Sequence, residues 1–73
     1  MLEEKGGVMM VKINGIEKDV AGMTLNDYLE SEHYNLKRVA VECNGDIVPK
    51  AQYPSFILKD EYEIEVVSFV GGG

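Results

Sequence analysis

The stretch Tyr62-Glu63-Ile64-Glu65-Val66-Val67-Ser68-Phe69 decides the fold, and it runs directly into Val70-Gly71-Gly72-Gly73. Apolar and polar residues alternate over its first half, which is the pattern of a strand with one buried face. Tyr62, Ile64 and Val66 are expected to face inward. The outward-facing positions are then Glu63, Glu65, Val67 and Phe69. The sequence therefore predicts a half-buried strand immediately before a run of glycines.

The glycine run, Gly71-Gly72-Gly73, differs in kind from the strand before it. Glycine loses more conformational freedom on ordering than any other residue, so we expect this run to be flexible. Three extended residues reach roughly 10 Å. Without Cβ atoms, such a tail can thread a narrow channel and bring a terminal carboxylate into another protein's active site. The predicted organisation is an N-terminal extension (1–8), a folded domain (9–70) and a flexible tail (71–73).

Length and charge restrict the classes of function. The 73 residues form one small domain, and a domain of this size buries only about 60% of its unfolded surface. A deep substrate cavity does not fit beside so thin a core, which favours a carrier, adaptor or binding module over an enzyme. The 13 acidic and 7 basic residues give a formal net charge of −6. This charge argues against nucleic acid or an anionic membrane as partner and is compatible with a basic protein surface.

The expected location is the cytoplasm, and the expected state is a monomer. No apolar run approaches the ~20 residues of a membrane span, and the first residues lack the pattern of a secretory signal. The single Cys43 cannot form an internal disulfide, which is typical of a reducing compartment. We expect residues 1–8 to be a disordered, non-native extension, with the natural start at Met9 or Met10. N-terminal mass analysis of the protein from its native host would contradict this if Met1 were intact.

Two Asn-Gly pairs predict tight turns between strands. Asn14-Gly15 and Asn44-Gly45 suit a type I′ hairpin turn, because both central positions of that turn need positive φ. The strands that flank them are expected at residues 9–13, 16–20, 39–43 and 46–48. In the strand at 39–43, alternation predicts that Ala40 and Glu42 face outward.

A short helix is predicted between the two hairpins. Thr24 and Asp27 resemble a capping box, in which each side chain accepts a hydrogen bond from the backbone N–H of the other residue. The helix is expected to end within residues 33–35. Its apolar stripe is formed by Leu25, Tyr28 and Leu29, with a contribution from the stem of Glu32.

The segment before the last strand is predicted to be a loop with one helical turn at residues 49–56. Ile57 and Leu58 are expected to fill the core. The order strand, strand, helix, strand, short strand, strand excludes repeated βαβ units and indicates an α+β fold, a mixed sheet with the helix packed across one face. The first and last strands are expected to lie side by side and parallel at its centre.

Five segments, in this order, have the pattern of a known family. They are Val11–Gly15, Thr24–Leu29, Val39–Pro49, Ile64–Val67 and Phe69–Gly73. The chain thereby resembles the small sulfur-carrier proteins of the ubiquitin-like β-grasp fold, most closely the carriers of thiamine (thiazole) biosynthesis. The combination of Val-Glu-x-Asn-Gly-x-Ile-Val-Pro with a Val-Gly-Gly-Gly end is specific. One departure is Asp60-Glu61-Tyr62, which lacks the family's glycine in this turn, so the turn must be of another type or must strain Glu61.

The resemblance implies a four- to five-stranded β-grasp sheet and a terminus that reacts. A ubiquitin-activating-enzyme-like adenylyltransferase would use ATP and magnesium to adenylate the carboxylate of Gly73. Sulfur from a cysteine-desulfurase persulfide would displace AMP to leave a thiocarboxylate, and thiazole synthase would receive the sulfur. The carrier itself would bind no cofactor and would contain no catalytic residue. Its tail, Gly71 to Gly73, would enter the partner's active site.

Partner docking is expected on the last strand. Val67 and Phe69 are expected to be exposed apolar groups beside the tail, with Glu63 and Glu65 as an acidic stripe behind them. Exposed apolar groups with charge around them suit a transient interface. Together with Val70, these residues are the predicted partner-binding surface. The alternative interpretation is that they only cover and solvate a strand.

Three other functions remain open at this point: a small subunit of molybdopterin synthase, a ubiquitin-like protein modifier, and an interaction module with an inactive tail. Two single residues could carry chemistry but have simpler interpretations. Cys43 is expected to be a buried structural cysteine, because its strand phase turns it inward. His33, the only histidine, lacks a cluster of further ligands and is expected to face solvent at the end of the helix.

Overall fold

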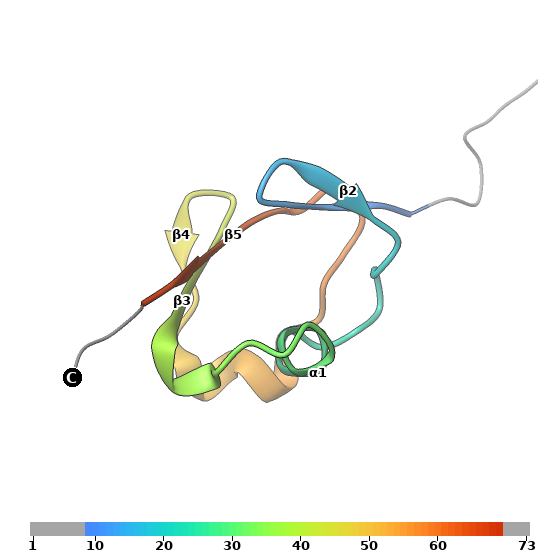
Figure 1. Ribbon diagram of the computed structural model, residues 1–73. Coiled ribbons are helices and arrows are strands. Elements are labelled where there is room, and N and C mark those ends of the chain that lie inside the picture. The colour runs from blue at the N-terminus through green and yellow to red at the C-terminus, as the bar shows by residue number, and fades with distance from the viewer. Residues whose placement is uncertain (1–8, 70–73) are drawn as a thin grey trace, which may run out of the picture.

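The computed structural model describes residues 9–69, and both the proposed extension (1–8) and residues 70–73 lie outside this range. A five-stranded mixed sheet in the order β2-β1-β5-β3-β4 forms the body of the protein (Figure 1). β1 and β5 pair in parallel at its centre, as predicted, and the other neighbours are antiparallel. The strands are β1 (Val11–Ile13), β2 (Ile16–Lys18), β3 (Val39–Cys43), β4 (Asp46–Ile47) and β5 (Glu63–Ser68). The helical segments are α1 (Leu25–Ser31) and the 3₁₀ segments η1 (Leu36–Arg38) and η2 (Lys50–Ser55).

Both Asn-Gly pairs form the expected turns. Asn14 and Gly15 have φ angles of 50° and 84°, and Asn44 and Gly45 have φ angles of 52° and 90°. These left-handed values at both central positions are those of a type I′ turn, whose twist matches that of the flanking strands. The hairpins β1–β2 and β3–β4 are therefore determined locally.

The two turn asparagines also hydrogen-bond to the central strand. The Asn14 side chain accepts from the backbone N–H of Val66 at 2.8 Å and donates to the Val66 carbonyl at 3.3 Å. On the other side of β5, the Asn44 side chain accepts from the backbone N–H of Glu63 at 2.9 Å, and the Asn44 N–H donates to the Glu63 carbonyl at 2.8 Å. The asparagines thus satisfy backbone groups of β5 at the points where β1 and β3 turn away.

Helix α1 begins at its predicted cap but is shorter than expected. The Thr24 hydroxyl accepts from the backbone N–H of Asp27 at 3.0 Å, which is one half of the predicted capping box. The helix ends at Ser31, and Glu32 is exposed rather than part of the apolar stripe. The reason is His33, whose positive φ of 65° stops the helical turn.

The core lies between one face of the sheet and the layer formed by α1 and η2 (Figure 1). Leu25, Leu29 and Leu58 are fully buried against the sheet. The core also contains Tyr28 of α1, Tyr53 of η2 and Val48. The inward residues of the strands complete it: Val11, Ile13, Val39, Val41, Ile64 and Val66. The other face of the sheet carries no helix in the part of the chain that the structure describes, which confirms the predicted α+β architecture.

The expectation that Ile57 and Leu58 both fill the core is wrong for Ile57, which is 41% exposed, whereas Leu58 is fully buried. Leu58 makes two backbone hydrogen bonds, from its N–H to the Met23 carbonyl at 2.8 Å and from the Gly22 N–H to its carbonyl at 2.7 Å. Ile57 forms a β-bridge with Thr24. The segment is therefore extended, and successive side chains of an extended segment point to opposite sides.

The turn before β5 strains Glu61, which was one of the two outcomes expected. Glu61 has a φ of 70°, in the left-handed region that favours glycine. Its N–H donates to the Met10 carbonyl at 2.8 Å, and the Tyr62 N–H donates to the Lys59 carbonyl at 3.1 Å. These hydrogen bonds, together with one from the Met10 N–H to Asp60 Oδ1 at 3.0 Å, hold the turn against the start of β1.

We predict that Glu61→Gly stabilises the protein by about 0.5–1 kcal/mol, because the strain of a non-glycine residue at positive φ exceeds the extra entropy of glycine in the unfolded chain. Urea unfolding should show a higher midpoint with an unchanged slope. Glu61→Gln is the control, since it removes the charge but keeps the backbone strain. A lower midpoint for Glu61→Gly than for Glu61→Gln would contradict the assignment.

Candidate functional site

The residues predicted to react or to thread a partner, Gly71, Gly72 and Gly73, lie outside the described residues, as does Val70 of the docking prediction. The structure describes the chain up to Phe69, directly after β5. The Phe69 N–H donates to the Arg38 carbonyl at 2.7 Å, so β5 remains attached to the start of β3 up to its last described residue. The candidate site is therefore the surface around the end of β5, directly before residues 70–73.

Alternation along β5 follows the prediction. Ile64 and Val66 are 1% and 7% exposed, whereas Val67 and Phe69 are 54% and 53% exposed. Glu63 and Glu65 are exposed, and Tyr62 is half-buried. The predicted outward residues thus lie on the side of the sheet opposite the core. Their role in docking stays a prediction.

The strand register adds residues that sequence reasoning did not connect with docking. On β3, Ala40 lies opposite Val67 and Glu42 lies opposite Glu65. On β4, Ile47 lies opposite Glu42 and is 74% exposed. Alternation in β3 had already predicted that Ala40 and Glu42 face outward, but only the register shows that they lie beside β5. We call this surface the open face; it comprises Ala40, Glu42, Ile47, Glu63, Glu65, Val67 and Phe69.

The charges of the open face are not balanced within it. Glu42 and Glu65 are directly opposite each other on neighbouring antiparallel strands, and like charges in this position destabilise a sheet. Near the start of β5 the corresponding neighbour is basic, since Lys12 lies opposite Glu63. The Glu42–Glu65 pair is therefore the part of the face that gains most from a cation supplied by a partner.

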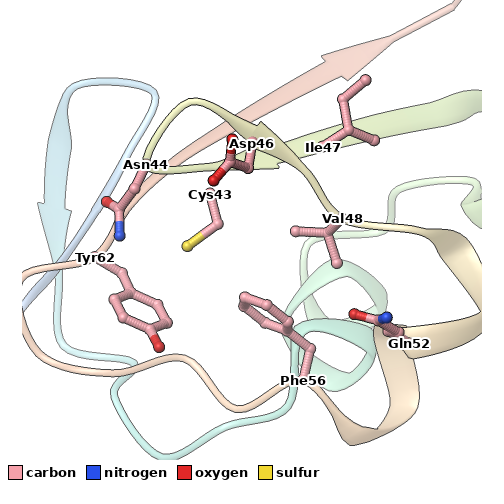
Figure 2. Close-up of a pocket in the computed structure, with 8 residues that line it drawn as sticks. All are labelled: Cys43, Asn44, Asp46, Ile47, Val48, Gln52, Phe56 and Tyr62. Atoms are coloured by element: carbon pink, nitrogen blue, oxygen red, sulfur yellow. The ribbon is translucent and has the colours of Figure 1, made fainter.

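Figure 2 shows a pocket between the β3–β4 hairpin, the segment η2 and the residues just before β5. It has a volume of about 280 Å³. The Cys43 thiol points into it, towards the rings of Phe56 and Tyr62, whose centroids are 6.0 Å apart. Its lining residues are Cys43, Asn44, Asp46, Ile47, Val48, Gln52, Phe56 and Tyr62. Ile47 lines the rim of the pocket, and its side chain points away from the pocket's centre (Figure 2).

Cys43 is half-buried, so the expectation of a buried cysteine holds only in part. Burial, and to a smaller extent the nearby Asp46 carboxylate, raise the pKa of the Cys43 thiol. A raised pKa keeps the thiol protonated at neutral pH, whereas a nucleophilic cysteine needs a lowered pKa. This direction supports the structural interpretation of Cys43.

His33 is exposed directly after α1. Within residues 9–69, no group of three or more His, Cys, Asp or Glu side chains is arranged to hold a metal ion. In the same range, none of the helical segments has the length and apolar composition needed to cross a membrane.

We predict that iodoacetamide alkylates Cys43 several-fold more slowly at pH 8 in the folded protein than in urea, because the raised pKa lowers the fraction of thiolate. The midpoint of the rate against pH should lie at higher pH when the chain is folded. Asp46→Asn should recover only the smaller part of this difference, since burial is the larger cause. Faster alkylation of the folded protein at equal pH would contradict the assignment.

Comparison with known families and structures adds independent findings. Residues 11–73 match the model of the ThiS family. The chain is 41% identical over 68 residues to the sulfur carrier protein ThiS of Bacillus subtilis (strain 168). This match covers 88% of this chain and 100% of that protein. It also resembles the crystal structure of the thiamine biosynthesis protein ThiS from Geobacter metallireducens, with a TM-score of 0.73 and 25% identity over 89% of this chain and 100% of that chain.

A second kind of relative is much longer. The chain is 39% identical over 66 residues to a thiazole synthase of Paramagnetospirillum magneticum (strain ATCC 700264 / AMB-1). The match covers 89% of this chain but 20% of that protein. The chain therefore spans about a fifth of the length of this relative, and the rest of the relative has no counterpart in it.

Proposed function

Because this chain belongs to the ThiS family, we propose that it is a sulfur carrier of thiamine biosynthesis and that its Gly73 carboxylate is the group that carries the sulfur. The observation that supports this most directly is the 41% identity to the Bacillus sulfur carrier over that protein's full length. The β-grasp fold shared with the Geobacter protein supports the same assignment. The family match also favours the thiamine pathway over molybdopterin synthesis and over protein modification.

The proposed chemistry follows from the properties of a carboxylate. A carboxylate is a poor electrophile, so a ubiquitin-activating-enzyme-like adenylyltransferase would first join Gly73 to AMP, using ATP and magnesium and releasing pyrophosphate. The terminal sulfur of a cysteine-desulfurase persulfide would then displace AMP and form an acyl disulfide. A second thiol would reduce that disulfide, which leaves a thiocarboxylate on Gly73 and a disulfide between the two thiols. The nucleotide and the metal would be held by the partner, not by this chain.

Thiazole synthase is the proposed acceptor of the sulfur. A segment similar to this chain makes up 20% of a longer thiazole synthase from Paramagnetospirillum magneticum and 20% of another from Magnetococcus marinus. Occurrence of both in one polypeptide supports a functional link between this domain and that enzyme. In this proposal the present chain is a protein co-substrate, acted on by its partners rather than catalysing a reaction itself.

The division of labour within the chain follows the fold. Residues 9–70 would form the body, and residues 71–73 would form a flexible tail that enters the partner's active site. The open face surrounds the end of β5, where residues 70–73 begin. Its exposed Val67 and Phe69 can desolvate against a partner, while the Glu42–Glu65 pair can bind basic side chains. We therefore propose the open face as the docking surface for the enzymes that act on Gly73.

We predict that incubation with the adenylyltransferase, ATP and a sulfur donor raises the mass of the chain by ~16 Da, the difference between oxygen and sulfur. A variant that lacks Gly72 and Gly73 should gain no mass, because its terminus falls short of the active site by roughly 7 Å. High-mass conjugates would instead indicate a protein modifier, and an unchanged mass of the full chain would contradict the proposed function.

We predict that Glu65→Lys has opposite effects on folding and on docking. The introduced lysine would lie opposite Glu42, so an ion pair would replace a pair of like charges. This should raise the free energy of unfolding by about 0.2–1 kcal/mol. Binding to the adenylyltransferase, measured by calorimetry, should weaken several-fold. Glu30→Lys on the exposed side of α1 is the control, because it changes the net charge equally on the opposite side of the sheet. Equal weakening by both variants would show that only net charge matters.

A further inference from the structure

The two Asn-Gly turns differ in how tightly the asparagine side chain is held. The Asn14 amide forms two partly buried hydrogen bonds with the backbone of Val66, one as acceptor at 2.8 Å and one as donor at 3.3 Å. The Asn44 amide accepts one hydrogen bond, from the Glu63 N–H at 2.9 Å, and this bond is exposed to solvent. Within residues 9–69, the amide nitrogen of Asn44 has no protein acceptor.

An asparagine followed by glycine can lose its side-chain amide in water. Hydroxide removes the proton of the glycine N–H, and the main-chain nitrogen attacks the side-chain carbon Cγ of the asparagine. A new N–Cγ bond closes a succinimide ring while the Cγ–Nδ2 bond breaks, and Nδ2 takes a proton from water and leaves as ammonia. A second water molecule opens the ring to aspartate or isoaspartate. Glycine favours this attack because it has no side chain to obstruct it.

Only two of the four asparagines in the chain precede a glycine. Asn26 and Asn35 are followed by Asp27 and Leu36, whose side chains obstruct the attack. In both Asn-Gly turns the side-chain oxygen of the asparagine is held towards β5 by the hydrogen bonds described above. The side chain must leave this position before its Cγ can reach the glycine nitrogen. The strength of these hydrogen bonds therefore controls the rate in the folded protein.

The two side chains differ in what they leave behind when they rotate. Release of Asn14 leaves the N–H and the C=O of Val66 without their partner, and Val66 is 7% exposed. A buried donor without an acceptor is costly because it has lost water as well. Release of Asn44 frees only the N–H of Glu63, which is an exposed residue, so water can replace the amide. Rotation of Asn44 is therefore the easier of the two.

The surroundings of Asn44 also supply the water that the reaction consumes. Figure 2 shows the Asn44 side chain at the rim of the pocket. The pocket has a volume of about 280 Å³ and is lined by polar as well as apolar side chains. Such a space is large enough to hold several water molecules. Both Asn44 and Gly45 are exposed.

We propose that Asn44 is a site of spontaneous deamidation in the folded protein, whereas Asn14 is protected by its hydrogen bonds to β5. Aspartate at position 44 keeps an oxygen that can accept from the Glu63 N–H, and it adds one negative charge at the rim of the pocket. Isoaspartate adds a carbon atom to the main chain of the turn. A two-residue hairpin turn cannot accommodate this atom, so the pairing of Cys43 with Asp46 would be lost.

Incubation of the folded protein at pH 8, followed by mass spectrometry of its peptides, tests the proposal. Cleavage after lysine and arginine places the two turns in separate peptides, residues 13–18 and residues 39–50. Deamidation raises the mass of a peptide by about 1 Da. Peptide 39–50 should gain this mass about fivefold faster than peptide 13–18, because the local opening that it needs is easier. Equal rates, or a faster gain in peptide 13–18, would overturn the proposal.

The same incubation in urea is the control for local sequence. The unfolded chain lacks the hydrogen bonds to β5, so the two Asn-Gly pairs should react at rates within about twofold of each other. Both should react faster than in the folded protein. A fivefold difference that persists in urea would show that the neighbouring residues cause it, and the structural explanation would be overturned.

A matched pair of variants tests whether the two side chains are held unequally. Asn14→Asp places a carboxylate oxygen against the Val66 carbonyl to which the amide donates, so it should clearly lower the midpoint of urea unfolding. Asn44→Asp is the product of deamidation and keeps its acceptor for the Glu63 N–H, so its midpoint should fall less. Equal losses in the two variants would contradict the unequal restraint on which the proposal depends.

Discussion

Strand β5 is held at the centre of the sheet by main-chain hydrogen bonds on both sides, and the side chains of Asn14 and Asn44 complete them where the neighbouring strands turn away. The parallel pairing of β1 with β5 brings together the first and the last strand of the described residues. A parallel pair needs a long crossover between its strands. Here the crossover contains α1, β3, β4 and both 3₁₀ segments, so the rest of the fold is the connection that this pairing requires.

The central position of β5 also gives the protein two chemically different faces. Val11, Leu25 and Ile64 are fully or almost fully buried on one side, where the helical layer covers the sheet. The other side presents carboxylates and the exposed Val67 and Phe69 around the end of β5. A domain of this size buries a smaller share of its unfolded surface than a large domain does, so an uncovered apolar region costs stability that burial against another protein would restore. The same strand thus contributes to the core and to the open face, and residues 70–73 follow directly after it.

The asparagines explain why the two hairpin turns matter beyond local geometry. A type I′ turn accepts several residue pairs, including Gly-Gly, but only an amide side chain can both accept from and donate to a strand backbone as Asn14 does with Val66. The turn residues therefore set the register of β5 against β1 and β3. The like-charge pair Glu42–Glu65 is a consequence of that register.

The sequence by itself determined the features whose physics is local. The φ preferences of Asn-Gly predicted both turns, the N-cap of Thr24 predicted the start of α1, and alternation predicted the faces of β5. The missing glycine at Glu61 left two outcomes open, another turn type or backbone strain, and the structure shows the strain. The end of α1 was predicted less well, because His33 is not one of the residue types, Gly and Asn, that signal a left-handed helix end in a sequence. The orientation of Ile57 was predicted wrongly, because its bridge with Thr24 joins segments far apart in the chain.

Only the tertiary structure decided which residues become neighbours across strands. Alternation states the face on which Glu42 or Ile47 lies, but not which residue of another strand lies opposite. That register is set by hydrogen bonds between segments far apart in the chain, such as Asn14 with Val66. Such bonds form only when the whole sheet is assembled, because the entropy of closing the long loop between them must be balanced by the core. The pairing of carboxylates on the open face is therefore a property of the fold.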